Sequence, residues 1–253
     1  MKNIRIIPRL DIKGPNVVKP VQTEALRVVG NPKELAYRYY SSGADELIYL
    51  DIVASLYQRN LDFDLLRSVT DGIFIPITVG GGIRSIHDIN NVLRSGADKV
   101  AINTYAVKNP DFIREAVREF GSQCIVLYVE AKKQRNNNYE VYTDGGREKS
   151  GREVISWIKK AIDLGVGEIL LTSVDRDGTR QGYDIELLKK ISSFSPIPII
   201  AHGGAGTFES FKEAIFEAKV DALGVSSVFH YNEHSISEVK NYLFKNDINV
   251  RII

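Results

Sequence analysis

The sequence has a single cysteine, Cys124, among its 253 residues, so no disulfide can form within the chain. Such cysteine usage is typical of a reducing compartment, and we expect a cytoplasmic protein. Lys and Arg number 33 and Asp and Glu number 32, and this balance gives no electrostatic basis for binding nucleic acid or an anionic membrane. No apolar run reaches the roughly 20 residues of a membrane span, and the chain starts without a signal-peptide core.

The sequence also lacks the motifs of a metal site and of a nucleophilic triad. The four histidines are scattered, and no cluster of Cys, His, Asp and Glu shows the spacing of a metal site. Ser, His and Asp residues show no triad order either. We therefore expect no metal ion and no other cofactor.

The features that are present alternate between strand-like and helix-like segments. Apolar segments of strand length occupy residues 5–11, 46–51, 75–79, 99–103, 124–130, 168–172, 197–201 and 222–226. Segments with helical periodicity follow them at residues 32–42, 61–69, 86–95, 110–120, 151–164, 185–192, 208–218 and 235–245. Eight such units in succession predict an α/β fold, a closed (β/α)8 TIM barrel.

The two halves of the chain resemble each other. Ile75-Pro76-Ile77, followed by a run of three glycines, has a counterpart about half a chain later in Ile197-Pro198-Ile199, followed by two glycines. The sequence therefore predicts one domain over residues 1–253, built from similar half-barrels at about 1–121 and 122–253. Polar residues 132–150 break the repeat. We predict a loop excursion with a small hairpin over the barrel mouth; a solvated surface loop is the alternative.

Paired glycines follow the third and the seventh strand-like segments. Glycine lets backbone N–H groups approach a phosphate closely, and a helix N-terminus behind it adds a favourable dipole. Each half thus offers candidate phosphate ligands: Gly81, Gly82, Asn103 and Thr104 in the first, and Gly203, Gly204, Ser226 and Ser227 in the second. Two phosphate sites across one mouth would suit an elongated ligand with a phosphate at each end. The alternative is that the glycines only form tight turns.

Two acids end the first and fifth strand-like segments, which lie opposite each other in an eight-stranded barrel. These are Asp11 and Glu130. Carboxyl groups on two sides of a mouth can act as general acid and general base on a ligand between them. The alternative is that each acid is solvated or paired with a lysine, such as Lys13, Lys19 or Lys132.

Charged residues open four of the strand-like segments, at the other end of the barrel. They alternate in sign and would crowd together there: Arg5, Glu46, Lys99 and Glu168. Because that face usually serves stability, one interpretation is a salt-bridge ring that closes the core. The other is a polar gate to a passage through the barrel.

Several longer motifs carry a family resemblance. They include Leu10-Asp11-Ile12-Lys13, Thr78-Val79-Gly80-Gly81-Gly82-Ile83-Arg84, Gly96-Ala97-Asp98-Lys99-Val100, Asp175-Arg176-Asp177-Gly178-Thr179 and Gly203-Gly204-Ala205-Gly206. Over nearly its full length the chain resembles the cyclase subunit of imidazole glycerol phosphate synthase, from histidine biosynthesis. The resemblance implies a barrel that docks a HisH-type glutaminase on its lower face. It also implies that ammonia crosses the barrel and attacks a bisphosphorylated ribulosyl formimino carboxamide ribonucleotide.

The resemblance also implies roles for individual residues. Asp11 and Glu130 would be catalytic, and Asp98 would belong to the docking face. The ammonia gate would consist of Arg5, Glu46, Lys99 and Glu168. The substrate and its phosphates would be held by Lys19, Gly81, Gly82, Asn103, Thr104, Asp177, Gly178, Gly203, Gly204, Ser226 and Ser227.

The sequence departs from the family pattern around the substrate mouth. Glu130 stands where the family has Asp, Arg9 replaces Cys, Tyr128 replaces a small residue, and Pro20 and His202 replace Gly and Ser. These changes resemble a second branch of paralogues from surface-polysaccharide loci, which partner a glutaminase and a sugar amidotransferase to make amidated or acetamidino sugars. We therefore expect such a paralogue, forming little or no imidazole glycerol phosphate. The alternatives are a genuine cyclase that tolerates Glu130 and a non-catalytic scaffold subunit.

Overall fold

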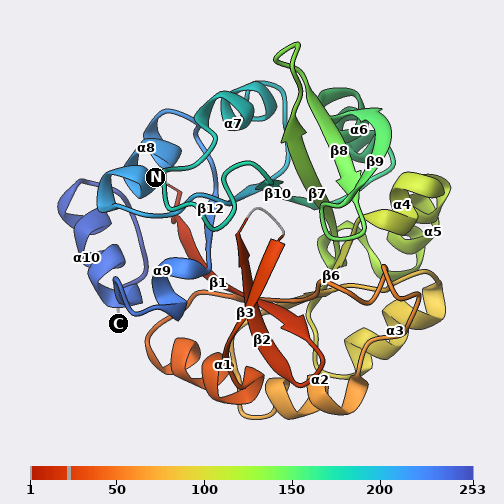
Figure 1. Ribbon diagram of the computed structural model, residues 1–253, viewed down its shortest axis with the longest axis horizontal. Helices are drawn as coiled ribbons and strands as arrows, with labels where there is room; N and C mark the ends of the chain where they lie inside the picture. Colours follow the sequence, from red (N-terminus) through yellow and green to blue (C-terminus); the bar gives the residue numbers. More distant parts are fainter. Residues whose placement is uncertain (1, 22–23, 253) are drawn as a thin grey trace.

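The computed structural model describes residues 2–21 and 24–252, and its centre is a closed barrel of eight parallel strands (Figure 1). The strands follow one another around the barrel in chain order, and pairing of the last with the first closes the ring. They are β1 (Arg5–Lys13), β4 (Leu47–Asp51), β5 (Ile77–Gly80), β6 (Lys99–Ile102), β7 (Ile125–Lys133), β10 (Glu168–Ser173), β11 (Ile199–His202) and β12 (Ala222–Val225). The predicted (β/α)8 barrel is confirmed.

Helices cover the outside of the barrel (Figure 1). They are α1 (Pro32–Ser41), α2 (Phe63–Thr70), α3 (Ile86–Arg94), α5 (Asp111–Phe120), α6 (Val154–Asp163), α7 (Ile185–Ser192), α8 (Phe208–Phe216) and α10 (Ile236–Lys245). Most begin after a polar side chain that accepts hydrogen bonds from the first turn, and Ser235 and Glu238 form a reciprocal capping box at α10. Among residues 2–21 and 24–252, no helix is long and apolar enough to cross a membrane.

Three short helical elements are not predicted from the sequence. They are α4 (Thr104–Lys108), the 3-10 helix η1 (Ser122–Cys124) and α9 (Ser227–His230). Each has five residues or fewer, which is too short for a periodic pattern to show. The helices α4 and α9 begin directly after β6 and β12, so they lie at the mouth of the barrel.

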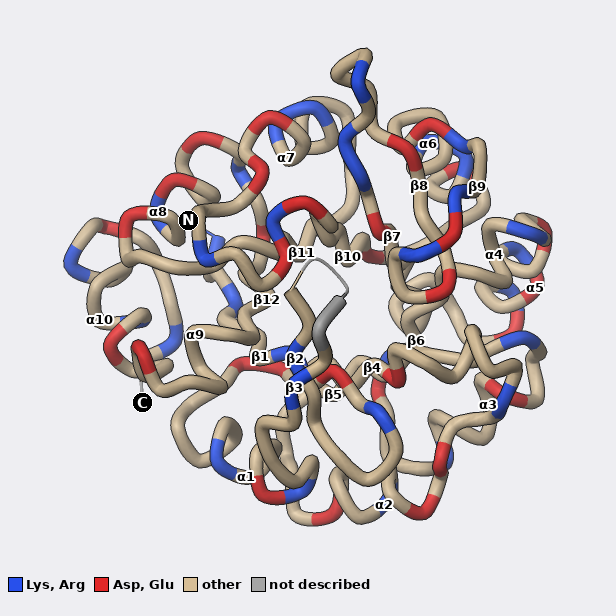
Figure 2. The backbone as a smooth tube through the Cα atoms, in the orientation of Figure 1, with Lys and Arg blue, Asp and Glu red and all other residues tan. Residues whose placement is uncertain are grey.

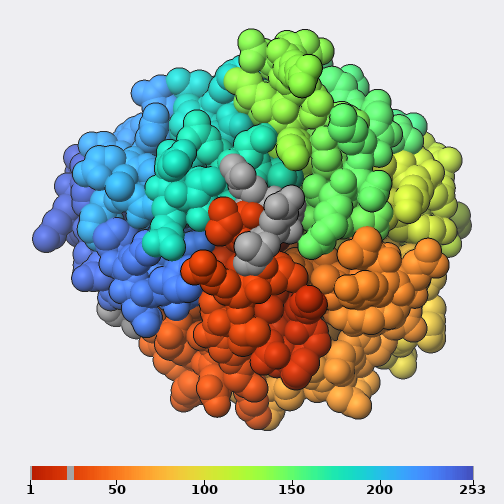
Figure 3. Space-filling model, in the orientation of Figure 1, coloured from red at the N-terminus to blue at the C-terminus, as the bar shows by residue number. Residues whose placement is uncertain are grey.

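Two barrel strands run on beyond the mouth, which corrects the sequence prediction. The sequence predicts that the first strand ends at Asp11, but β1 continues to Lys13 because its last residues pair antiparallel with β2 (Asn16–Val21). That strand pairs in turn with β3 (Glu24–Gly30), in a region where no element is predicted. Figure 3 shows this orange-red hairpin in the middle of the mouth-side face.

The predicted excursion after Glu130 is an antiparallel sheet. β7 continues to Lys133 and pairs with β8 (Tyr139–Thr143), and β8 pairs with β9 (Glu148–Glu153). In Figure 3 this green segment lies next to the β2–β3 hairpin. Each strand that carries one of the two acids therefore also begins an antiparallel extension over the mouth.

Inside the barrel, alternate residues of each strand point inward and stack in layers. A charged layer lies at the strand starts and contains Arg5, Glu46, Lys99 and Glu168. Next comes an apolar cluster, called the apolar layer below, to which β4 contributes two residues. It consists of Ile7, Ile48, Leu50, Ala101, Val126, Leu170, Ile200 and Ala222. Towards the mouth follows a polar layer, with Arg9, Tyr128, Thr172 and His202. Because side chains alternate along each strand, the buried Arg9 lies directly on the mouth side of the apolar layer.

Carboxylates also fix the strand starts from outside the barrel. Asp45, Asp98 and Asp221 each accept a hydrogen bond, at 2.7–2.8 Å, from a backbone N–H of a neighbouring strand. Lys240 of α10 is only 3% exposed and donates to Asp45 and to the carbonyl of Gly43, both at 2.7 Å. These contacts attach the last helix to the bottom of the barrel.

Candidate functional site

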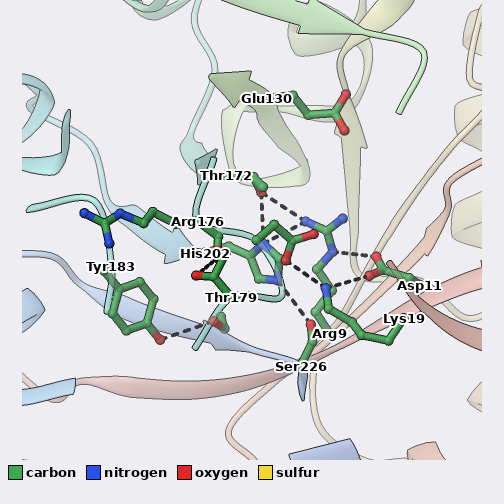
Figure 4. Close-up of polar contacts among 12 residues, drawn as sticks. Arg9, Asp11, Lys19, Glu130, Thr172, Arg176, Thr179, Tyr183, His202 and Ser226 are labelled. Carbon is green, nitrogen blue, oxygen red and sulfur yellow. Dashed lines mark hydrogen bonds and ion pairs between the residues drawn. The ribbon is translucent and has the colours of Figure 1, made fainter. Parts of the chain in front are cut away.

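The polar layer at the mouth is organised around the buried guanidinium of Arg9 (Figure 4). Its Nε donates to Asp11 at 2.7 Å, Nη1 to Thr172 at 3.0 Å, and Nη2 to the Tyr128 hydroxyl at 3.2 Å. Nη1 also lies 3.1 Å from Nδ1 of His202. Side chains from β1, β7, β10 and β11 therefore converge on one cation.

Asp11 is fully buried, and cations compensate its charge. In addition to Arg9, Lys19 of β2 lies 3.4 Å from Oδ2 of Asp11 and pairs with Asp177 at 2.7 Å. Burial alone would raise the pKa of Asp11, but the charges of Arg9 and Lys19 hold it below its ordinary value. Asp11 therefore forms the ion pair with a lysine that the sequence left as an alternative, and the lysine is Lys19.

Glu130 is equally buried, but neutral donors hold it. The Tyr128 hydroxyl donates to Oε1 and Asn103 Nδ2 to Oε2, both at 2.9 Å. Burial raises the pKa of Glu130 to about 7, because the hydrogen bond from Tyr128 and the charge of Arg9 offset only part of the desolvation. Near neutral pH much of Glu130 is protonated, whereas Asp11 is ionised.

His202 completes the layer as a neutral imidazole. Burial and the charges of Arg9 and Lys19 push the pKa of His202 well below its ordinary value. Because arginine can only donate, Nδ1 of His202 is the acceptor and the proton lies on Nε2. That nitrogen is 3.1 Å from Oγ of Ser226, so Ser226 is bonded within the protein.

A cavity of about 290 Å³ opens from Glu130 towards the glycines of the first half. Its walls include the predicted phosphate ligands of this half, Gly81, Gly82, Asn103 and Thr104. Arg84 and Lys108 also line it and would favour an anionic group. Gly81 has a φ of +106°, and a Cβ there would lie 2.3 Å from the Asp51 carbonyl oxygen. Close packing alone therefore already requires glycine, and phosphate binding stays a prediction.

The glycines of the second half are also tightly packed. A Cβ on Gly203 would lie 2.6 Å from the Ser173 carbonyl oxygen, and one on Gly204 would lie 2.1 Å from a backbone carbonyl oxygen. Gly178 lies against β2, where a Cβ would be 2.6 Å from the carbonyl oxygen of Pro20. These contacts fit the tight-turn alternative, and the second phosphate site stays a prediction for Gly203, Gly204, Ser226 and Ser227.

At the opposite end of the barrel the four predicted charges form a closed ring. Arg5 donates to Glu46 at 2.7 Å and to Glu168 at 2.6 Å, and Lys99 lies 3.1 and 2.9 Å from the remaining oxygens. The geometry of a salt-bridge ring is present, and a role as a gate stays a prediction. Asp98 is exposed next to the ring. Figure 2 shows that basic and acidic residues are interspersed along the helices around the barrel.

The sequence marks Arg9 and Tyr128 as departures from a family pattern but not as site residues. Alternation along the strand was the available signal, because residues 5, 7, 9 and 11 share one face. The same rule places Tyr128 on the face of Glu130. Among residues 2–21 and 24–252, no group of three or more His, Cys, Asp or Glu side chains could hold a metal ion.

The structure is thus a (β/α)8 barrel with two buried acids at the mouth, one bonded to cations and the other to neutral donors. Active sites of barrel enzymes lie at this end of the strands. The sequence profile of a family described as histidine biosynthesis protein matches residues 5–235, and this chain belongs to that family.

Three relatives each carry the name imidazole glycerol phosphate synthase subunit HisF. The relative from Legionella pneumophila is 57% identical over 211 residues, which cover 83% of this chain and 100% of the relative. Those from Alkaliphilus metalliredigens and Streptococcus mutans are 48% and 47% identical and cover 98% of this chain and 98% of each relative. The family inferred from the motifs is confirmed, whereas these comparisons do not show the surface-polysaccharide branch.

Proposed function

We propose that this chain is the ammonia-using cyclase subunit of an imidazole glycerol phosphate synthase. Its substrate would be the bisphosphorylated ribulosyl formimino carboxamide ribonucleotide. The names of the three relatives support this function better than the sugar-amidating paralogue that the departures at the mouth led us to expect. The observation that carries the proposal is the pair of buried acids at the mouth, of which Asp11 is bonded to two cations and Glu130 to neutral donors.

The two acids suit two different tasks. A cyclisation that expels a leaving group needs one group that accepts a proton or stabilises positive charge, and another that delivers a proton. Asp11, kept ionised by Arg9 and Lys19, suits the first task. Glu130, with a pKa of about 7, suits delivery of a proton near neutral pH. Separated pKa values in one site are the usual mark of such a division.

The proposal places the two phosphates of the substrate at opposite sides of the mouth. One would bind beside Gly82 and Asn103, where Arg84 and Lys108 line the cavity. The other would bind at Gly204 and Ser226. Because Ser226 Oγ accepts from Nε2 of His202, the hydroxyl proton of Ser226 would be directed at the second phosphate.

A glutaminase subunit at the bottom face completes the proposal. We place ammonia entry at the ring of Arg5, Glu46, Lys99 and Glu168, and we assign exposed Asp98 to the docking surface. Because ion pairs close the ring, passage of ammonia would require at least one pair to separate. The apolar layer above the ring would favour neutral ammonia over ammonium.

An assay with saturating ammonium salt tests the chemistry without a glutaminase. Purified protein and the bisphosphorylated ribonucleotide should yield imidazole glycerol phosphate. Asp11→Asn and Glu130→Gln should each lower kcat by on the order of 100-fold or more. Glu115→Gln, an equivalent change on the exposed face of α5, serves as the control and should leave kcat unchanged. Folded wild-type protein that forms no product would contradict the proposal.

A second candidate function is favoured by Arg9 and Tyr128, two large side chains that contact each other in the polar layer beside the acids. The barrel would then serve a complex of a glutaminase and a sugar amidotransferase, and wild-type protein would be nearly inactive in the ammonium assay. Glu130→Asp should restore only part of the activity in that case, because Arg9 and Tyr128 remain. A scaffold subunit would stay inactive in every variant.

A further inference from the structure

We propose that Arg9 is a positioning residue that joins the two acids into one unit, holding Asp11 directly and Glu130 through Tyr128. The inference rests on the proposed function for its catalytic meaning, but the linkage itself is a property of the structure. It concerns two residues, Arg9 and Tyr128, that stand where the family pattern has smaller side chains.

The donor and acceptor of each hydrogen bond between Arg9, Tyr128 and Glu130 follow from the chemistry of the three side chains. Arginine has five N–H donors and no acceptor, so the Tyr128 oxygen must accept from Nη2 of Arg9 at 3.2 Å. The single hydroxyl proton of Tyr128 is then directed at Oε1 of Glu130, at 2.9 Å. The guanidinium carbon also lies 5.3 Å from the centre of the Tyr128 ring, which further fixes the two side chains.

The position of Arg9 is itself strongly determined. Its Nε is bonded to Asp11, and Nη1 contacts both Thr172 and His202. The side chain is 3% exposed, so water cannot replace a lost partner. A movement of the guanidinium therefore changes the surroundings of both acids together.

The remaining groups around Glu130 come from three elements. Asn103, after β6, donates to Oε2 and is fixed by a second bond, at 3.1 Å, to the carbonyl of Tyr142 on β8. The backbone N–H of Gly146, between β8 and β9, also bonds to the carboxyl, and the charge of Asp11 faces it from β1. Of these groups, Asp11 is bonded to Arg9 but reaches Glu130 only through its charge, whereas the Tyr128 hydroxyl hydrogen-bonds to both Arg9 and Glu130.

The linkage can be tested by carbon-13 NMR titration of protein labelled at the glutamate and aspartate carboxyl carbons. Signals are assigned by their loss in Glu130→Gln and Asp11→Asn. Tyr128→Phe removes only the hydroxyl, and the pKa of Glu130 should rise by on the order of one unit. Arg9→Met should raise the pKa values of both acids.

Tyr142→Phe is the matched control, because it makes the same chemical change on the strand paired with Glu130 and keeps the carbonyl that holds Asn103. It should leave the pKa of Glu130 unchanged. If Arg9→Met does not fold, Tyr128→Phe alone decides. An unchanged pKa of Glu130 in Tyr128→Phe would overturn the inference, as would an Arg9→Met variant that affects Asp11 only.

A kinetic measurement separates this inference from the proposed function. In the ammonium assay, Tyr128→Phe should shift the limb of the kcat/KM–pH profile that belongs to Glu130 by the same amount as the NMR titration, because both measurements report the free enzyme. The KM of the ribonucleotide should change less than about twofold, because Tyr128 would act through Glu130 and not through binding. If wild-type protein is inactive while the NMR shifts occur, the proposed function fails and the linkage stands.

Discussion

At the scale of single residues, the mouth contains two carboxyl groups that are buried to nearly the same degree. Asp11 is 0% exposed and Glu130 is 4% exposed, yet their pKa values move in opposite directions. The difference arises from the partners, since Asp11 faces two cations and Glu130 faces neutral donors. Burial therefore does not decide protonation here; the charge of the nearest donor does.

Glu130→Gln should make the stability of the protein less dependent on pH. The pKa of Glu130 is about 7 in the folded protein, against an ordinary value of 4.5, so the folded state binds the proton more tightly than the unfolded chain between these values. Wild-type stability through this group is therefore greatest below about pH 4.5 and declines as the pH rises to about 7, by at most about 3 kcal/mol. Urea unfolding at pH 5 and pH 8 measures this decline, which the variant should lack.

The control for this experiment is Glu115→Gln on α5, where the side chain is exposed. Its unfolding free energy should follow that of the wild type at both pH values. If Glu130→Gln also follows the wild type in parallel, then Glu130 is not a buried acid with a raised pKa, and its assignment as a proton donor would lose its support.

The positions of the two acids could be predicted from the sequence, but their environment could not. Each acid follows an apolar run, and that local pattern places it at the carboxyl end of a strand. Arg9 is only two residues from Asp11 in sequence, yet its bonds also involve Tyr128, Thr172 and His202 from the other half of the chain. Such contacts depend on closure of the barrel, which a local pattern cannot describe.

At the scale of secondary-structure elements, the main addition to the predicted fold is the β2–β3 hairpin. Its sequence shows no clean alternation, since β2 contains a proline and the buried Lys19. The hairpin exists because it pairs with the end of β1 and because Lys19 binds Asp11 and Asp177. Tertiary contacts outweigh the weak local preference, which explains why the sequence does not reveal it.

Gly178→Ala should separate this hairpin from the loop after β10. Gly178 has a φ of +75°, and the new methyl group would lie 2.6 Å from the Pro20 carbonyl oxygen and 2.9 Å from Cα of Val21. Backbone atoms cannot yield as a flexible side chain can, so β2 or the loop must shift. We expect the free energy of unfolding, measured with urea, to fall by about 2–4 kcal/mol because of overpacking together with backbone strain.

Gly72→Ala provides the control, because Gly72 has a similar φ of +78° and nothing lies within 4 Å of where its new methyl group would stand. Its free energy of unfolding should fall by only about 1 kcal/mol, which is the cost of holding alanine in this backbone conformation. Equal losses in the two variants would show that the hairpin does not pack tightly against Gly178.

At the scale of the whole molecule, the sequence predicts the barrel well because eight similar units repeat one pattern. The eight strands and their order are as predicted, and the boundaries differ mainly where strands run into extensions. The charged ring could also be predicted, since its members stand at or directly before the starts of four strands and must meet at the axis. The origin of the barrel from two half-barrels stays a prediction.

Arg5→Met should destabilise the molecule through this ring. Glu46 and Glu168 are 7% and 6% exposed and would retain only Lys99 as a ring partner. Loss of one member of a buried ion pair costs about 3–5 kcal/mol, and the partial exposure of Arg5 places our expectation at about 2–3 kcal/mol. Urea unfolding at low and high salt measures the effect.

Arg114→Met is the control on the exposed face of α5, where Arg114 pairs with Asp111 at 2.9 Å. A change of less than about 0.5 kcal/mol is expected for such a surface pair. If Arg5→Met costs no more than Arg114→Met, the ring contributes little to stability, and the apolar layer above it would have to hold this end of the barrel together.

Closure of the barrel has a consequence for synthesis of the chain on the ribosome. β1 pairs with β4 on one side and with β12 on the other, where Arg5 is paired with Ala222. More than 200 further residues must therefore be synthesised after Arg5 before β12 is available for pairing. At about 5–20 residues per second, this wait lasts on the order of 10–40 s. During that time the future interior of the barrel, with Arg5 and Arg9 on one side of a nascent sheet, is open to water. A chaperone that binds nascent chains would therefore encounter an incomplete barrel whose future interior surface is exposed.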